Sequence, residues 1–266
     1  GEGENYYGLY GNQGFLPGVQ SLGNVLNDAG YNQALIVGSD SKFGGRETYY
    51  ATHGSCVVYD IASAWEEGIV PDQYHNGFWG MEDRYLYRYA KKMLMQMSAE
   101  EAPFALTLLT VDTHFPSGYI CEYCENTSDE PYENVYSCAS RQIMEFCDWL
   151  QKQDFYEDTT IVIAGDHLSM AGDYVARNIK DESIRRVYNC FINAAAEPVN
   201  TRNREISSFD MFPTTLAAMG CTIEGERLGL GTNAFSAVPT LMERYGSEHF
   251  MKEVARYSEF YVNNFY

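Results

Sequence analysis

The residues best suited to chemistry are Asp166 and His167, which directly follow the stretch 159–165, Thr-Thr-Ile-Val-Ile-Ala-Gly. Its apolar residues predict a buried strand that is covered on both faces. Ligands of open α/β sheets bind at the carboxyl ends of strands, where this pair would lie. A carboxylate oxygen and an imidazole nitrogen suit zinc, manganese or a similar divalent ion, and Gly165 permits the bend needed to reach one ion. An isolated Asp-His pair also fits a turn in which the carboxylate caps the next segment.

Two further predicted strands end in polar residues. The apolar run 34–37 is followed by a glycine-bearing loop that ends in Arg46, and the run 104–111 is followed by Asp112 and His114. The carboxyl ends of parallel strands lie at one edge of a sheet, so we expect these groups to share one rim with the Asp-His pair.

Each of these residues has a functional and a structural interpretation. The planar guanidinium of Arg46 suits phosphate or sulfate oxygens, and Gly44 and Gly45 would let a head group approach the backbone. A surface salt bridge explains Arg46 equally well. His114 can protonate a leaving oxygen or donate to an anion, or it can bond to a neighbouring carbonyl. Asp112 can orient that imidazole or cap a turn.

The composition excludes several classes of protein. A hydrophobic content of 45% with 15% aromatic residues excludes disorder. No run approaches the roughly 20 apolar residues of a membrane helix. Lysine and arginine number 18 against 37 acidic residues, which gives a net charge of −19. Nucleic acid is therefore excluded as a general partner, and a cation kept in a pocket of so acidic a chain would suit an anionic substrate.

The seven cysteines allow at most three internal disulfides. Cys121 and Cys124 form a CxxC motif without a second such motif in the chain. Cys138 and Cys147 lie nine residues apart on a predicted helix, hence on opposite faces, so both cannot join one site with the CxxC pair. We expect a surface-loop disulfide or free thiols rather than a metal site.

Alternating helices and buried strands predict an α/β three-layer sandwich with a mainly parallel sheet. We expect one domain over residues 1–236 and a C-terminal helical tail, 237–266, packed on the same domain, with one apolar face from about residue 247. Residues 60–78 are expected to be irregular and 117–131 to form an excursion loop. We expect helices at 19–29, 47–53, 82–97, 132–153 and 209–219, the last interrupted by Pro213, and strands at 34–37, 56–59, 104–111, 159–164 and 188–194.

Five motifs occur in an order and spacing that resemble one family. They are Phe43-Gly44-Gly45-Arg46, Trp79-Gly80 with Asp83, Thr110 with Asp112-Thr113-His114-Phe115-Pro116, Gly165-Asp166-His167, and Asp210 with Pro213-Thr214. Together they resemble the sulfatase-like phosphoglycerol transferases of the alkaline phosphatase superfamily, which include lipoteichoic acid synthases and enzymes that modify periplasmic glucans. The resemblance extends to about residue 236 and implies an alkaline phosphatase/sulfatase-like fold.

The resemblance also implies a reaction. In this family a threonine nucleophile, held by one divalent metal, takes glycerol phosphate from phosphatidylglycerol and passes it to a glycan or polyol acceptor. The metal is most often manganese, with magnesium or zinc as alternatives. By resemblance, two residues are metal ligands, Asp166 and His167. The catalytic residue is His114, and the substrate-binding residues are Phe43, Arg46, Trp79 and Asp83.

Two departures from the family pattern qualify these expectations. Gly44 stands where the lipoteichoic branch has an aromatic residue. In addition, no histidine follows Val37, where that branch has one. The family pattern therefore does not identify the residues that form the pocket for the head group or the acceptor. The family's threonine nucleophile and a further acidic ligand lie before the helix that is expected near Val19, and residues 1–18 contain no threonine. We therefore expect a C-terminal part of a catalytic domain that lacks its N-terminal portion, inactive alone and preceded by membrane helices. Its place would be the extracytoplasmic face of the cell membrane.

Two alternative functions are compatible with the same residues. The first is a sulfatase or phosphodiester hydrolase that uses water as the final acceptor. The second is a non-catalytic envelope ectodomain that keeps the fold and binds anionic lipid heads or glycans.

Overall fold

The computed structural model describes residues 16–71, 78–180 and 185–265. The chain divides into two compact units, of which the first comprises residues 1–153, 168–185 and 265–266 and the second comprises residues 154–167 and 186–264. The predicted domain limit at residue 236 stays a prediction.

The first unit is built on a three-stranded parallel sheet with the strand order β2-β1-β3. The central strand β1 (Asn32–Val37) pairs with β2 (Val57–Tyr59) on one side and with β3 (Phe104–Leu109) on the other. The side chains from Ala34 to Val37 are at most 3% exposed. Such a continuous apolar run is typical of a strand that is covered on both faces.

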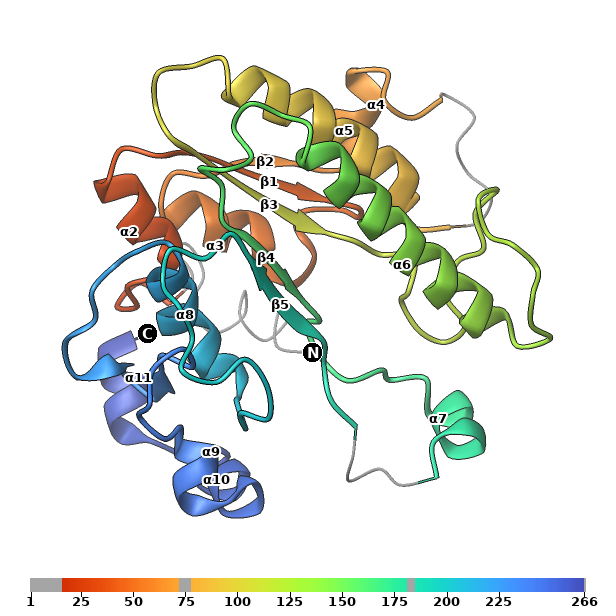
Figure 1. The fold of residues 1–266 in the computed structure, drawn as a ribbon. Helices are drawn as coiled ribbons and strands as arrows, with labels where there is room; N and C mark the ends of the chain where they lie inside the picture. Colours follow the sequence, from red (N-terminus) through yellow and green to blue (C-terminus); the bar gives the residue numbers. More distant parts are fainter. Residues whose placement is uncertain (1–15, 72–77, 181–184, 266) are drawn as a thin grey trace. The chain divides into compact units, whose positions relative to one another are not determined.

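Helices cover this sheet on both faces (Figure 1). Helices α5 (Asp83–Met97) and α6 (Pro131–Leu150) lie on one face, while α2 (Leu22–Asp28) and α3 (Arg46–Thr52) pack on the other side. Helix α5 buries Leu86, Tyr89, Ala90 and Met93, one stripe at helical spacing, against the sheet. The predicted α/β class with a parallel sheet is confirmed, and all these elements were expected from periodicity.

Two short helices of this unit were not predicted. Residues 60–78 were expected to be irregular, but α4 (Ile61–Glu66) forms there because the Asp60 carboxylate accepts hydrogen bonds from the Ala62 and Ser63 N–H groups. Helix α7 (Gly172–Asn178) lies in the segment 168–185, which follows β4 in the sequence and belongs to the first unit. In addition, a single 3₁₀ turn, η1 (Phe43–Gly45), leads into α3.

The second unit contains β4 (Ile161–Ala164), which pairs antiparallel with β5 (Asn189–Ile192). The prediction of a strand covered on both faces is wrong here: the residues of β4 are half-buried or exposed, and Val162 is 36% exposed. The strand also lies in a two-stranded antiparallel sheet rather than in a parallel one. Four apolar residues in a row cannot distinguish these cases, because burial depends on what packs against the strand.

Helix α8 (Ser208–Ala218) organises the rest of the second unit. Its Asp210 is 1% exposed and accepts hydrogen bonds from the N–H of Ser207 (2.7 Å) and the N–H of Thr232 (2.7 Å). Thr232 belongs to the short hairpin of β6 (Arg227–Leu228) and β7 (Gly231–Thr232), which follows the 3₁₀ turn η3 (Glu224–Glu226). The Asp210 motif therefore joins a helix start to a hairpin.

The tail forms three short helices rather than one apolar face. They are α9 (Leu241–Tyr245), α10 (Ser247–Val254) and α11 (Glu259–Phe265). The apolar face was expected to include Phe250, Tyr257 and Tyr261. Phe250 is 5% exposed, whereas Tyr257 is 80% and Tyr261 is 40% exposed. The prediction of a single face is wrong because the chain leaves the helix after Val254. None of the helices in the described parts of the chain combines the length and apolar character required to cross a membrane.

Candidate functional site

Three segments of the first unit meet at the carboxyl edge of its sheet. Gly38, directly after β1, donates its N–H to the Leu109 carbonyl at the end of β3 (3.1 Å) and accepts a hydrogen bond from the Met81 N–H (2.5 Å). A Cβ atom on Gly80 would lie 2.7 Å from the Gly38 carbonyl oxygen, so only glycine permits this approach. The loop after β1, the Trp79 segment and the turn after β3 are thereby held together, as predicted for this edge.

Arg46 is the cation at this edge. Its Nη2 donates to the Ser39 hydroxyl (2.9 Å) and to the Asp40 carbonyl (2.9 Å). Its Nε is buried, and no described group accepts a hydrogen bond from it. No described carboxylate forms an ion pair with Arg46, so the salt-bridge interpretation does not hold among these residues. Burial lowers the pKa of Arg46, and Asp40 partly offsets this. The side chain is a positioned cation with spare donor capacity.

The backbone before Arg46 takes the left-handed conformation twice. Gly44 has φ 68° and Gly45 has φ 73°, values that favour glycine. This turn places Phe43 beside the guanidinium, with 5.3 Å between the Arg46 Cζ and the ring centroid. Phe43 is 75% exposed, so its ring is an apolar surface next to a cation.

His114 lies in the exposed turn after β3 and contacts Trp79. The two ring centroids are 4.9 Å apart, with the rings nearly perpendicular. The Nδ1 of His114 lies 2.8 Å from the Phe115 carbonyl oxygen. A carbonyl oxygen can only accept, so Nδ1 carries the proton in this bond and Nε2 does not take part in it. Trp79 is 52% exposed and can line a pocket from this position.

Asp83, predicted to bind substrate, is 1% exposed. Its Oδ1 accepts hydrogen bonds from the N–H groups of Val111 (2.7 Å) and Asp112 (3.2 Å). These bonds fix the start of the turn that carries His114. The geometry supports a positioning role for Asp83 at the edge of the site.

Removing this carboxylate should destabilise the first unit. Asp83→Ala leaves two buried N–H groups without an acceptor, so we expect the free energy of unfolding in urea to fall by about 2–4 kcal/mol. Asp129→Ala, at an exposed aspartate, is the matched control and should change it by less than about 0.5 kcal/mol. Equal effects of the two substitutions would rule out the positioning role.

Asp112 is a second buried acid beside Asp83. It is 2% exposed, and neither of its carboxylate oxygens has a hydrogen-bond partner of good geometry among the described residues. Burial, followed by repulsion from Asp83, raises the pKa of Asp112 to about 9. Burial likewise raises the pKa of Asp83 to about 6. The folded chain therefore shifts the pKa of both carboxyl groups upward, and Asp112 is the one shifted further.

The buried Asp112 makes the free energy of unfolding depend on pH. The unfolded Asp112 ionises near its ordinary pKa of 3.8, whereas the folded one keeps its proton up to about pH 9. The unfolded state therefore binds fewer protons in this window, and stability falls as pH rises, by up to about 1.4 kcal/mol per pH unit. Urea midpoints between pH 5 and 9 should show this slope for the parent chain and a smaller slope for Asp112→Asn. An unchanged slope in the variant would contradict this assignment.

Asp166 and His167 follow β4 in the second unit. Their side chains are 67% and 54% exposed, and Asp166 Oδ2 lies 3.3 Å from His167 Nε2. A separation of this size fits two ligand atoms that share one ion with bonds of about 2.0–2.2 Å. Within this unit, the described residues bring no third carboxylate, histidine or cysteine to the pair. That the pair shares a site with Arg46 and His114 stays a prediction.

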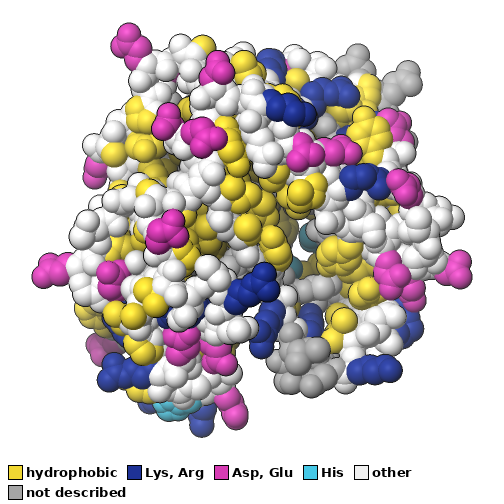
Figure 2. Space-filling model, in the orientation of Figure 1, with side chains coloured by type: hydrophobic (Ala, Val, Ile, Leu, Met, Phe, Trp, Pro, Cys, Tyr) yellow, Lys and Arg dark blue, Asp and Glu magenta, His cyan; other side chains and the backbone are white. Residues whose placement is uncertain are grey.

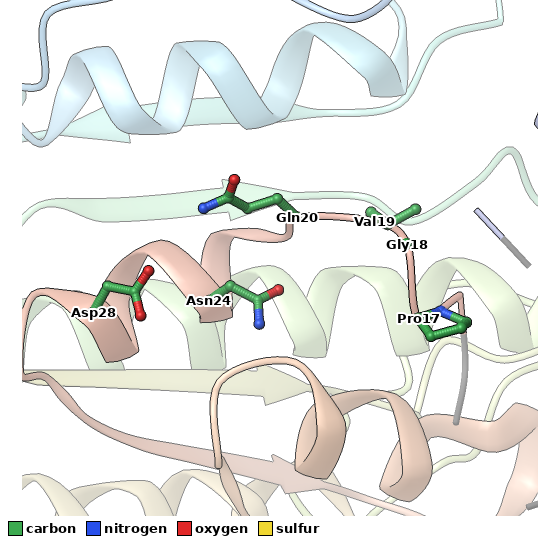
Figure 3. A pocket seen from close by; sticks show the side chains of 6 residues that line it. All are labelled: Pro17, Gly18, Val19, Gln20, Asn24 and Asp28. Carbon is green, nitrogen blue, oxygen red and sulfur yellow. The ribbon is translucent and has the colours of Figure 1, made fainter. Parts of the chain in front are cut away.

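A hollow of the first unit lies away from these groups. The hollow in Figure 3 lies at the start of α2 and is lined by polar groups such as Gln20, Asn24 and Asp28. Asn24 accepts from the Ser21 N–H and so belongs to the cap of α2. Figure 2 shows acidic side chains scattered over the visible face rather than gathered in one patch.

The structure places two further residues at this edge of the sheet. Tyr119 stacks on Phe78 with 4.1 Å between ring centroids, and its N–H donates to the Asp112 carbonyl (2.7 Å). Ser39 is 3% exposed and holds Arg46. Ser39 opens the polar loop after the strand 34–37, and Tyr119 follows the His114 motif, so the sequence already indicated both as residues of this edge.

The first unit is thus a parallel α/β sheet with a positioned arginine and histidine at its carboxyl edge, where ligands of such sheets bind. The chain belongs to the sulfatase family, whose family model matches residues 2–221. The family resemblance expected from the five motifs is thereby confirmed.

Curated relatives and solved structures agree with this placement. The chain is 35% identical over 165 residues to phosphoglycerol transferase I of Xanthomonas campestris pv. campestris. This alignment covers 60% of the chain and 23% of that relative. It is 29% identical to phosphoglycerol transferase I of Escherichia coli over 162 residues, 59% of the chain and 21% of the relative. The aligned part is thus less than a quarter of these relatives.

The solved structures share the fold. The lipoteichoic acid synthase LtaP of Listeria monocytogenes has a TM-score of 0.63 at 20% identity. This match covers 86% of the present chain and 59% of the LtaP chain. A protein of the alkaline phosphatase superfamily from Vibrio parahaemolyticus has a TM-score of 0.57 at 21% identity. This match covers 75% of the present chain and 47% of that protein's chain. The predicted alkaline phosphatase/sulfatase-like fold is confirmed.

Proposed function

We propose that this chain is part of a phosphoglycerol transferase that moves glycerol phosphate from phosphatidylglycerol to a glycan or polyol acceptor in the cell envelope. One observation carries the proposal. In a chain of net charge −19, Arg46 is half-buried at the sheet edge with no ion pair to a described carboxylate and with an unpartnered Nε. A cation in this state is suited to an anionic substrate group, and the relatives named phosphoglycerol transferase support the proposal that this group is a phosphoglycerol.

The residues of the first unit would bind the phosphoglycerol group. Arg46 would direct its free N–H groups at phosphate oxygens, and the exposed rings of Phe43 and Trp79 would cover the glycerol carbons. His114, with its Nδ1 proton held by the Phe115 carbonyl, would use Nε2 to donate to a phosphate oxygen or to protonate the leaving oxygen. Asp83 would hold the turn that places this histidine.

The residues of the second unit would bind a divalent metal, as superfamily members do. Asp166 and His167 present a carboxylate oxygen and an imidazole nitrogen 3.3 Å apart, which fits two ligand positions of Mn²⁺, Mg²⁺ or Zn²⁺. When bound, such an ion would neutralise charge on the transferring phosphoryl group. A threonine nucleophile and a further acidic ligand would complete the site, and the reaction would take place on the extracytoplasmic face of the membrane.

Product analysis separates this proposal from the two alternatives. The full protein is incubated with phosphatidylglycerol and Mn²⁺, with and without a glucan or polyol acceptor. A transferase should attach glycerol phosphate to the acceptor, whereas a hydrolase should release the same amount of free glycerol phosphate in both cases. A binding ectodomain should release no diacylglycerol, and that result would overturn the proposal.

A further inference from the structure

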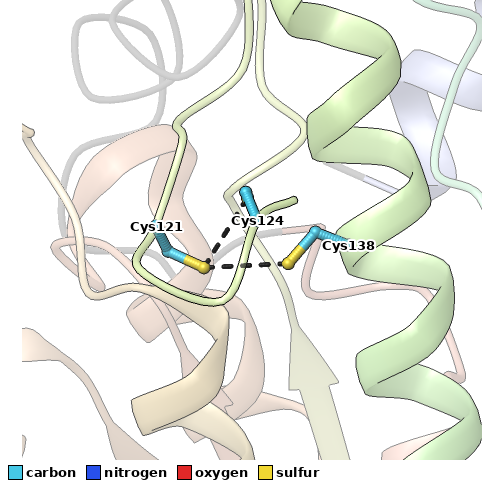
Figure 4. A group of neighbouring side chains, drawn as sticks. All are labelled: Cys121, Cys124 and Cys138. Carbon is cyan, nitrogen blue, oxygen red and sulfur yellow. Dashed lines mark hydrogen bonds between the residues drawn. The ribbon is translucent and has the colours of Figure 1, made fainter. Parts of the chain in front are cut away.

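Three cysteines of the first unit lie together beside the candidate site (Figure 4). Cys121 and Cys124 belong to the loop after β3, and Cys138 lies on α6. The Sγ of Cys121 is 3.7 Å from that of Cys124 and 3.8 Å from that of Cys138, and all three sulfurs lie within 4.8 Å of one another. The expectation that Cys138 and Cys147 do not both join the CxxC pair agrees with this grouping, but Cys138 does join it.

The spacing fits a shared metal ion. In a tetrahedral zinc site with Zn–S bonds of about 2.3 Å, sulfurs are about 3.8 Å apart, whereas the sulfurs of a disulfide are about 2.05 Å apart. The two measured separations match the first value. All three side chains converge from two elements on one point (Figure 4).

The surroundings suit bound thiolates. Gln142 Nε2 lies 3.4 Å and Arg141 Nη2 lies 3.9 Å from the Cys138 sulfur, so both can donate to it. Three thiolates and one Zn²⁺ leave one negative charge beside the Arg141 guanidinium, which also pairs with Glu125 (3.0 Å). The Oε1 of Gln142 is buried without a partner among the described residues and is a protein oxygen available near the cluster. Such N–H donors are typical of the second layer around a thiolate metal site.

The thiols do not have the surroundings of reactive cysteines. Burial raises the pKa of Cys121, and it raises the pKa of Cys124 to about 11. Reactive thiols require the opposite shift, because the thiolate is the nucleophile. A divalent cation is the partner that would favour the deprotonated form at neutral pH.

We propose that Cys121, Cys124 and Cys138 bind one structural zinc ion, with Gln142 Oε1 or a water in the fourth position. Binding replaces three thiol protons by one Zn²⁺ and releases the protons to solvent. The ion would fasten the loop to α6. The same loop carries Tyr119, which bonds to the Asp112 backbone, so the fastening would hold the His114 turn. This site does not depend on the proposed transfer reaction.

Metal analysis of the purified 266-residue chain tests the site. We expect one zinc per chain, retained in the double variant Asp166→Asn/His167→Ala, in which the other candidate metal position is removed. Cys138→Ser should lose the zinc, while Cys221→Ser, at an exposed cysteine of the second unit, should keep it. Zinc that is lost with Asp166 and His167 but kept without Cys138 would overturn the proposal.

A second measurement applies even if Cys138→Ser does not fold. Replacing zinc by Co²⁺ in the parent chain should produce an intense sulfur-to-cobalt charge-transfer band, and all seven thiols should become titratable after unfolding with a chelator. Absence of the band would overturn the proposal. A disulfide that peptide mapping locates at Cys121, Cys124 or Cys138 would do so as well.

Discussion

Asp166→Asn in the full protein is expected to reduce release of diacylglycerol from phosphatidylglycerol by at least about 100-fold. Loss of a group that only orients a metal ligand already costs about 10–100-fold, so loss of a ligand should cost no less. Asparagine keeps the shape of the side chain but removes its charge, so the loss would come from weaker metal binding. Added Mn²⁺ should therefore restore part of the rate, and the metal concentration at half-maximal rate should rise.

Asp158→Asn is the matched control for this prediction. Asp158 is an exposed aspartate of the same unit, three residues before β4, whereas Asp166 lies two residues after that strand. The control should retain the parent rate and the parent response to Mn²⁺. If Asp166→Asn behaves in the same way as Asp158→Asn, the Asp-His pair is a strand-end turn and not a metal ligand.

Arg46→Ala is expected to reduce kcat/KM for phosphatidylglycerol by about 100- to 1,000-fold. Removal of one donor to a developing anion typically costs that much, and Arg46 has unused N–H groups to offer. Arg46→Lys keeps the charge but loses the planar fork, so it should recover only part of the loss. The rates are compared at fixed ionic strength with saturating Mn²⁺.

The control for Arg46 is Arg177→Ala. Arg177 is an exposed arginine of the same unit and pairs with Glu130 on the surface (3.1 Å). Its removal should change stability by at most about 1 kcal/mol and leave kcat/KM unchanged. A kcat/KM for Arg46→Ala within a factor of three of the parent would show that the free guanidinium does not meet the substrate.

Much of the first unit could be predicted from periodicity. The apolar runs that became β1 and β3 and the helical stripes of α5 and α6 were located to within a few residues, because each of them buries one continuous surface. The loops at the strand ends, with Arg46 and His114, follow from these strands. Helix α4 could not be found in this way, since it is short and its start depends on the single cap at Asp60.

Tertiary contacts explain what the sequence did not predict. The partners of Asp83 lie 28 and 29 residues further along the chain, and no local pattern indicates that its carboxylate binds two backbone N–H groups there. The approach of Cys138 to the CxxC pair likewise depends on the path of a long loop back to α6. The exposure of β4 depends on which elements pack against it. Its four apolar residues do not specify these elements.

The most direct test of the central claim is diacylglycerol release from phosphatidylglycerol vesicles by the full protein. It is measured with Mn²⁺ for the parent, Arg46→Ala, Asp166→Asn and the two control variants. The account predicts turnover in the parent and both controls and its loss in both site variants, with all five proteins folded by circular dichroism. Turnover that survives either site substitution, or a folded parent that releases no diacylglycerol, would contradict it.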